Sequence, residues 1–279
     1  MSLMELQSCL ARLYTSEVFR MLYLREPDEA LDGYDLSPHE AESLRSLDPK
    51  MINVFAATLV AKRARRAHRA YGSSYAWHGP ALDRLFHRFL ELQGSRPQPT
   101  VHHETVAFGH FAEQALSDLE RFPDAAAELV RFERSSYEAM FTREPPVQRP
   151  GPLGRPLEDD DVVAVAPGVV VEKFRHDVIA LDEALRSDGA TQDVAALTSW
   201  IAFRPGRDDG GQRLLRLNGP TATIVRSCQP ACSAGDVVRQ VAQELGAEDL
   251  RDAVLAGVAQ LAELGILRIN LPTRTETPR

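Results

Sequence analysis

Two histidines and a glutamate lie close together in the sequence, at His103, Glu104 and His110. Imidazole nitrogens and carboxylates are ligands that zinc and non-haem iron prefer in proteins, so this segment suggests a metal site. On a helix, the spacing puts both histidines on one face, whereas the apolar residues from Phe108 onward centre on roughly the opposite face. The zinc-protease pattern is absent, because Ala107 stands where a second histidine should follow Glu104. We therefore expect histidines that face solvent or a partner, and no metal site.

Cationic side chains crowd one predicted helix. They are Lys62, Arg63, Arg65, Arg66 and Arg69, with His68 beside them. Such groups bind carboxylates through charge-assisted hydrogen bonds, so the cluster suits an acidic peptide or the acidic surface of a partner. The alternative is a solvated helix face, which charge runs usually form. From these cations and the histidines we predict partner contacts at Arg63, Arg66, His103 and His110.

The cysteines Cys9, Cys228 and Cys232 are too few and too scattered for a disulfide framework, which fits a reducing compartment. A structural zinc site needs more ligands than Cys228 and Cys232 supply, so we expect ordinary thiols. Neither a phosphate-binding glycine loop nor a nucleophile elbow occurs in the sequence. We predict that this chain has no catalytic residues and no cofactor of its own.

Of the 279 residues, 44% are hydrophobic, which suffices for two domains with separate cores. The formal net charge of -8 gives no general attraction for phosphate backbones or anionic membranes. No run of about 18 apolar residues occurs, and the N-terminus lacks the pattern of a secretory signal. The composition predicts a soluble cytoplasmic protein whose partners include neither nucleic acid nor a membrane.

Residues 1–143 are predicted to be helical, because apolar residues recur there at three- and four-residue spacing. Ser37 and Pro38 with Glu40 three residues after the serine form a capping-box pattern, so a helix should begin there. The last helix of this half is predicted over 124–141. Prolines and glycines then predict a linker over 144–160.

The second half changes to β-branched residues. Over 162–174 they are divided by Pro167 and Gly168, which predicts a hairpin. The other elements expected are strands over 195–203, 213–218 and 266–269, and helices over 220–228, 234–245 and 248–264. This order predicts a winged helix-turn-helix domain over 161–270, followed by a flexible tail over 271–279. The whole chain is thus expected to be α+β, with a helical N-terminal domain.

Three stretches of this half, 213–228, 237–241 and 261–267, resemble the PqqD-like precursor-recognition domain, and 167–174 resembles its first strand. The resemblance implies binding of the leader segment of a ribosomal precursor peptide, which adds a strand to an open sheet edge. The residues expected to contact the peptide are Val169, Val171, Phe174, Arg251, Val254 and Leu255. Each of them has a core position as its alternative.

A helical domain fused to such a domain is similar to the partner subunits of multinuclear iron oxygenases in methanobactin and 3-thiaglutamate biosynthesis. This similarity implies a heterodimer in which iron and catalysis belong to the other chain. Residues 13–40 also resemble the small helical subunit of protocatechuate-type extradiol dioxygenases. That alternative again implies an accessory chain beside an iron oxygenase.

Two other function classes stay open. A winged-helix transcription regulator needs a basic recognition helix. The helix expected over 248–264 instead has one basic residue, Arg251, and four acidic residues, Glu248, Asp249, Asp252 and Glu263. An enzyme with its own metal would have to use the N-terminal histidines. The interpretation as a non-catalytic peptide-binding subunit requires an open strand edge in the second half.

Overall fold

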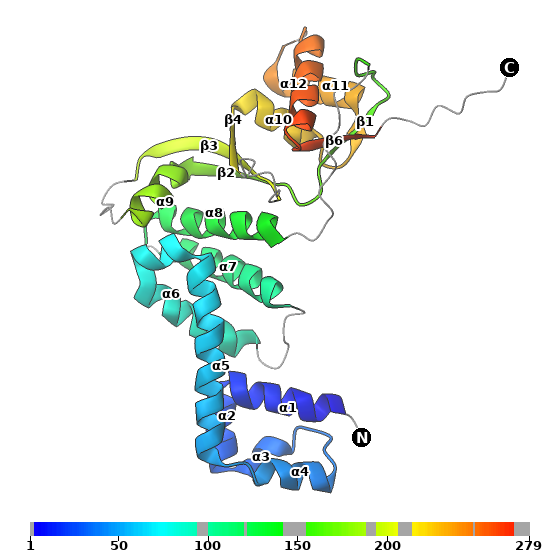
Figure 1. The fold of residues 1–279 in the computed structure, drawn as a ribbon. Coiled ribbons are helices and arrows are strands. Elements are labelled where there is room, and N and C mark those ends of the chain that lie inside the picture. The colour runs from blue at the N-terminus through cyan, green and yellow to red at the C-terminus, as the bar shows by residue number, and fades with distance from the viewer. Residues whose placement is uncertain are drawn as a thin grey trace, which may run out of the picture. The chain divides into compact units, whose positions relative to one another are not determined.

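The computed structural model describes residues 3–93, 100–119, 122–141, 155–187, 194–205, 214–247 and 249–270 (Figure 1). These residues form a mostly helical α+β fold with two small antiparallel sheets. The chain folds into two compact units. Unit 1 comprises Met1–Arg134 and Ile179–Gln192, and unit 2 comprises Ser135–Val178 and Asp193–Arg279. The division falls inside the helix over 124–141, whereas the sequence placed the domain boundary at 144–160. Residues 142–154 and the tail over 271–279 lie outside the described residues.

Unit 1 is built from helices. They are α1 (Leu3–Thr15), α2 (Glu17–Arg25), α3 (Pro27–Leu31), α4 (Pro38–Arg45), α5 (Pro49–Ala70), α6 (Gly72–Gln93), α7 (Val101–Ser117), the first part of α8 (Asp124–Phe141) and nearly all of α9 (Val178–Arg186). The start predicted for α4 is confirmed, because Ser37 and Glu40 form a complete capping box. The sequence did not predict α9.

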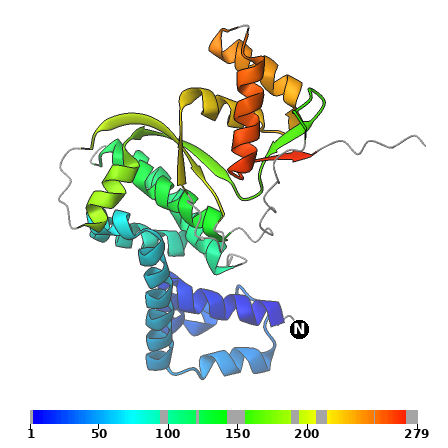
Figure 2. The ribbon, with the colours of Figure 1, turned by 45° about the horizontal axis from the view of Figure 1, so that its top comes forward.

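α5 contributes to two hydrophobic cores among the described residues of unit 1. Ile52 near its start is buried with residues of α1 and α2, such as Leu13 and Phe19. Ala67 near its end is buried with Phe86 and Phe108 of α6 and α7. The long helix between the two groups can be followed in both views (Figures 1 and 2).

Unit 2 contains both sheets. The first has the order β5 (Cys232–Ser233), β1 (Val162–Val165) and β6 (Leu267–Asn270), and the second has the order β2 (Val170–His176), β3 (Ala196–Phe203) and β4 (Leu214–Leu217). The helices α10 (Gly219–Ser227), α11 (Ala234–Leu245) and α12 (Arg251–Glu263) follow the second sheet along the chain. They agree closely with the three helices predicted, and α11 has the predicted bounds.

The prediction of a hairpin over 162–174 is wrong. β1 pairs with β5 and β6, whereas β2 pairs with β3. Between β1 and β2, the Ala166 N–H donates to the Ile266 carbonyl at 2.8 Å, and Gly168 takes a positive φ of 73°. This turn carries the chain from one sheet into the other. A run of β-branched residues predicts a strand, but tertiary packing selects its partner.

One core joins the sheets and helices of unit 2. Val163 and Leu267 from the first sheet, Ala202 from the second, and Val237 and Val258 from the helices are all buried in it. Leu215 and Leu217 of β4 pack against this core while staying partly exposed. β4 therefore lies where the core meets the surface.

Candidate functional site

β4 is an edge strand of the second sheet. Among the described residues it pairs only with β3, with Leu217 opposite Trp200 and Leu214 opposite Phe203. Three of its four residues are partly buried leucines, and the fourth, Arg216, is exposed. The outward N–H and C=O groups of an edge strand are suited to pairing with another extended chain.

The opposite edge of this sheet, formed by β2, carries more charged side chains. β2 exposes Lys173 and Arg175 along its length. Charged side chains on an edge strand discourage pairing with other chains, because an added strand would bury them. β4 exposes one charged side chain, Arg216, which already pairs with Asp177 of the same unit, so β4 is the edge better suited to strand addition.

Trp200 connects the β4 edge with the helices. Its side chain shares a face of the sheet with Leu217, its partner across the strand pair. The Arg226 guanidinium of α10 lies 5.1 Å from the Trp200 ring centroid, and Lys173 Nζ lies 5.7 Å from it. Both distances fit cation–π interactions.

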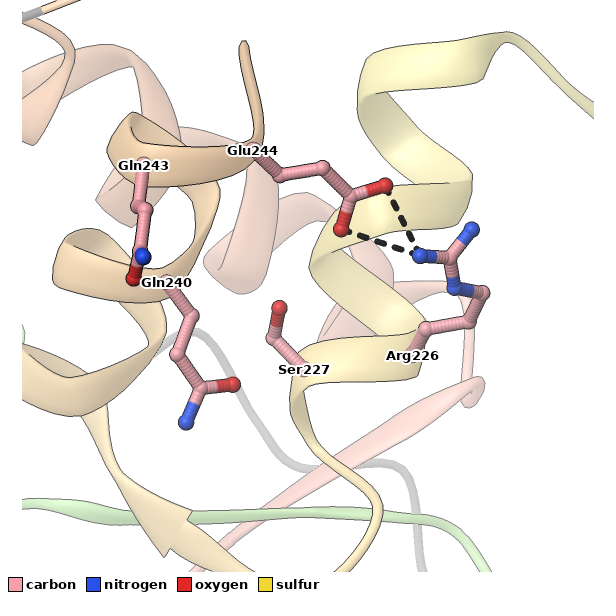
Figure 3. A pocket seen from close by; sticks show the side chains of 5 residues that line it. All are labelled: Arg226, Ser227, Gln240, Gln243 and Glu244. Carbon is pink, nitrogen blue, oxygen red and sulfur yellow. Dashed lines mark hydrogen bonds and ion pairs between the residues drawn. The ribbon is translucent and has the colours of Figure 1, made fainter. Parts of the chain in front are cut away.

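A groove between α10 and α11 begins at the same arginine (Figure 3). Its volume is about 550 Å³, and it is lined by Arg226, Ser227, Gln240, Gln243 and Glu244. The Nη2 of Arg226 donates to both carboxylate oxygens of Glu244, at 2.7 and 2.9 Å. Because each partner is 43% exposed, the pair contributes at most about 1 kcal/mol and can open for a ligand. The groove thus offers amides, a hydroxyl and a separable charge pair.

The structure places most of the residues expected to contact a peptide inside unit 2. Val169 and Val254 are buried in its core, against which Val171 and Leu255 pack while partly exposed. Phe174 is also buried, on the other face of the sheet, with its ring centroid 6.4 Å from that of Phe203. These buried side chains occupy the core positions that were the alternative.

Arg251 is the one residue of that expected set that is exposed. Its guanidinium pairs with Asp159 at 2.8 Å within unit 2. The surface residues best placed beside the β4 edge are instead Trp200, Arg226 and Leu217. An aromatic residue such as Trp200 suits a core and a binding surface equally well in the sequence, and Arg226 pairs with Glu244 only because α10 and α11 pack together.

The residues expected to contact a partner in unit 1 differ in accessibility. Arg66, His103 and His110 are exposed, as predicted for the histidines. His103 Nδ1 lies 2.7 Å from Thr100 Oγ1, and His110 Nε2 lies 3.4 Å from Arg134. Arg63 is only 11% exposed and pairs with Glu104 at 2.7 Å. Arg63 therefore stabilises the helices of unit 1 and offers no free charge.

Within the described ranges, no three or more His, Cys, Asp or Glu side chains are grouped so that they could hold a metal ion. The cysteines are free thiols, and burial raises the pKa of Cys9 to about 11 and that of Cys228 to about 12. Both thiols are protonated at neutral pH and are poor nucleophiles.

A buried acidic cluster in unit 1 was not predicted. The carboxylate of Glu133 accepts the backbone N–H groups of Ser73 and Ser74 at 2.8 and 3.1 Å, at the start of α6. The Ser73 hydroxyl donates to Asp182 of α9. Burial, as the largest cause, raises the pKa of Glu133 to about 7. The sequence held no signal for this cluster, because its members are far apart along the chain.

Comparison with models of known protein families and with curated proteins gives no match to this chain. None of the helices within the described ranges is long and apolar enough to cross a membrane. The site in unit 2 therefore has to be interpreted from its own geometry.

Proposed function

We propose that unit 2 binds an extended peptide as an added strand along β4. The observation that carries this proposal is the leucine-rich β4 edge, which has one strand partner among the described residues. An added strand would form backbone hydrogen bonds that depend little on its sequence. Its side chains on one face would lie next to Leu217 and Trp200, close to the groove at Arg226, which would supply selectivity.

We further propose that this peptide is a ribosomal precursor, and that the chain is a non-catalytic subunit of an iron-dependent oxygenase. The support is the resemblance of 213–228, 237–241 and 261–267 to the PqqD-like domain. The order of α10, β5, α11, α12 and β6 is also compatible with a winged helix-turn-helix. In this proposal the iron and the catalytic residues belong to the partner chain, and the complex works in the cytoplasm.

The acidic surface of α12 does not favour DNA as the ligand. Asp252 and Glu263 are exposed on this helix, and its one cation, Arg251, is paired with Asp159. A helix that enters a DNA groove needs unpaired cations for the phosphates. Peptide binding at β4 needs no such charge.

The experiment uses Trp200 as its reporter. The chain has two tryptophans, so Trp77→Phe leaves Trp200 as the sole tryptophan, whose emission can be excited selectively at wavelengths that tyrosine does not absorb. Peptides selected from a displayed library of random dodecamers would be titrated against the full chain with this substitution. We expect a change in Trp200 fluorescence and slower hydrogen exchange of the β4 amides.

Two lysine substitutions provide the matched comparison. Leu217→Lys adds a charge at the β4 edge and should weaken binding at least about tenfold. Leu197→Lys is the control, because Leu197 is an exposed leucine of β3 beyond the residues that pair with β4. Equal binding by both variants, with the β4 amides unprotected, would exclude β4 as the site.

The oxygenase proposal has a separate test. When the tagged full chain is purified from its native cells, an iron-containing protein should co-purify with it in about equimolar amount. The chain purified alone should contain no iron. A chain that itself holds stoichiometric iron would contradict this proposal.

A further inference from the structure

One face of α5 is exposed along most of the helix. It carries eight residues at three- and four-residue spacing, here called the α5 stripe: Met51, Val54, Phe55, Thr58, Lys62, Arg65, Arg66 and Arg69. With 100° per residue they span roughly 120° of the circumference and about 27 Å of length. The opposite face supplies the buried residues Ile52, Ala56 and Ala67. Unit 1 contacts the stripe at Phe55, whose ring centroid lies 4.6 Å from that of Tyr14 of α1, but leaves most of the stripe exposed.

The two halves of the α5 stripe differ in chemistry. At the start, Met51, Val54 and Phe55 are 60%, 52% and 54% exposed. The four cations Lys62, Arg65, Arg66 and Arg69 follow, all exposed. Within the described part of the chain none of these four forms an ion pair, whereas Arg63, beside the stripe, pairs with Glu104. The stripe combines exposed apolar area with cations for which the described ranges supply no counter-charge.

We propose that the α5 stripe binds an amphipathic helix of another protein chain, apolar in one half and acidic in the other. A straight helix presents ridges and grooves that suit a second helix and has no backbone edge for a strand. The acidic half of such a helix would pair with the four cations, and its apolar half would cover Met51, Val54 and Phe55. An antiparallel arrangement puts its glutamates in its N-terminal half, where the helix dipole also favours them.

A second copy of this chain does not fit the same face. Antiparallel packing of two α5 helices would put the cations of one against the apolar half of the other. Parallel packing would put like charges together. Either arrangement costs free energy, so the complementary helix must come from a different sequence.

An anionic membrane is also a poor match. Helices that lie in a membrane surface separate apolar and basic residues around the circumference. In the α5 stripe the two kinds are separated along the axis on one face, so burying Phe55 would draw Arg66 and Arg69 toward the lipid interior. The net charge of -8 further opposes binding to anionic lipids or nucleic acid.

The test uses a synthetic helical peptide of about 20 residues. Four glutamates occupy one face of its N-terminal half and three leucines the same face of its C-terminal half. A control peptide has the same composition with the glutamates moved to the opposite face. Fluorescence anisotropy with the full chain should show binding of the first peptide, at least about tenfold tighter than the control and weakened by salt.

Charge reversal locates the site. The double variant Lys62→Glu/Arg66→Glu should lose at least about tenfold in affinity, and a peptide with lysines in place of glutamates should restore binding to it. The matched control is Arg84→Glu/Arg88→Glu, which reverses two exposed cations of the same spacing on α6. Val54→Ser tests the apolar half and should also weaken binding.

Three results would overturn the proposal. They are equal binding of the two peptides, equal losses in the α5 and α6 double variants, and binding of phosphatidylserine vesicles through the stripe without binding of the peptide. The inference does not depend on the function proposed for unit 2. The α5 variants should keep the Trp200 response to the selected dodecamers, and Leu217→Lys should keep binding of the acidic peptide, so failure of either proposal can be recognised separately.

Discussion

At the scale of single residues, burial changes the acid–base chemistry of Glu133. Its carboxylate accepts hydrogen bonds from Ser73 and Ser74, which favour the charged form, but burial outweighs them and raises the pKa from 4.5 to about 7. Asp182, close by, opposes the charged form as well. The folded chain therefore prefers Glu133 protonated over a pH range in which the unfolded chain has it ionised.

This preference makes stability depend on pH. The contribution of Glu133 is fully present below about pH 4.5 and is lost as the pH rises through about 7. The loss is on the order of 3 kcal/mol. We expect the free energy of unfolding of Glu133→Gln, measured with urea, to change less with pH over this interval than that of the unsubstituted chain. Exposed Glu183→Gln is the control; a Glu133→Gln profile parallel to that of the control would contradict the assignment.

At the scale of elements, the packing of α7 depends on Gly109. The Tyr71 hydroxyl, at the end of α5, donates to the Thr105 carbonyl of α7 at 2.7 Å. A Cβ at Gly109 would lie 2.9 Å from Tyr71 Cζ, closer still to its hydroxyl, and 3.0 Å from Arg134 Cδ. Only a residue without a side chain lets the helix approach this tyrosine.

We predict that Gly109→Ala lowers the free energy of unfolding by about 1–3 kcal/mol, because the added methyl group overpacks the core. Thermal and urea unfolding of the full chain would measure the loss. Gly33→Ala serves as the control, since nothing lies within 4 Å of a Cβ at Gly33. Similar stability of both variants would show that Tyr71 moves aside at little cost.

At the scale of the whole molecule, the two units are not consecutive pieces of sequence. Residues Ile179–Gln192 belong to unit 1, although the strands before and after them belong to unit 2. Leu181 in this segment is buried, and Asp182 accepts the Ser73 hydroxyl of α6. Unit 1 is therefore incomplete if the chain ends at the predicted domain boundary.

A chain of residues 1–143 should consequently be less stable than unit 1 in the full protein. Hydrogen exchange at the start of α6 should be at least about tenfold faster, because local opening becomes easier without α9. Mass spectrometry of both proteins under the same conditions would measure this. Equal protection at Ser73 and Ser74 would mean that α9 adds nothing to unit 1.

Features that depend on residues three or four positions apart could be predicted from the amino-acid sequence. The capping box of Ser37 and Glu40, the bounds of α11 and the exposure of His103 and His110 are of this kind. Helical periodicity and capping are local, so they are readable before the chain folds. α9, which was not predicted, also has this local periodicity, since Val178, Leu181 and Leu185 recur at three- and four-residue spacing.

Contacts between residues that are far apart in the sequence became apparent only in the folded chain. Folding paired β1 with β5 and β6, buried Phe174 and Val254, and brought Arg226 to Glu244 and Ser73 to Glu133. Alternation along a strand predicts a face but not a partner, and an apolar residue suits a core and a binding surface equally well. Among the described residues, β4 lacks a second strand partner and most of one face of α5 is exposed because the other elements pack elsewhere, and no local pattern contains that information.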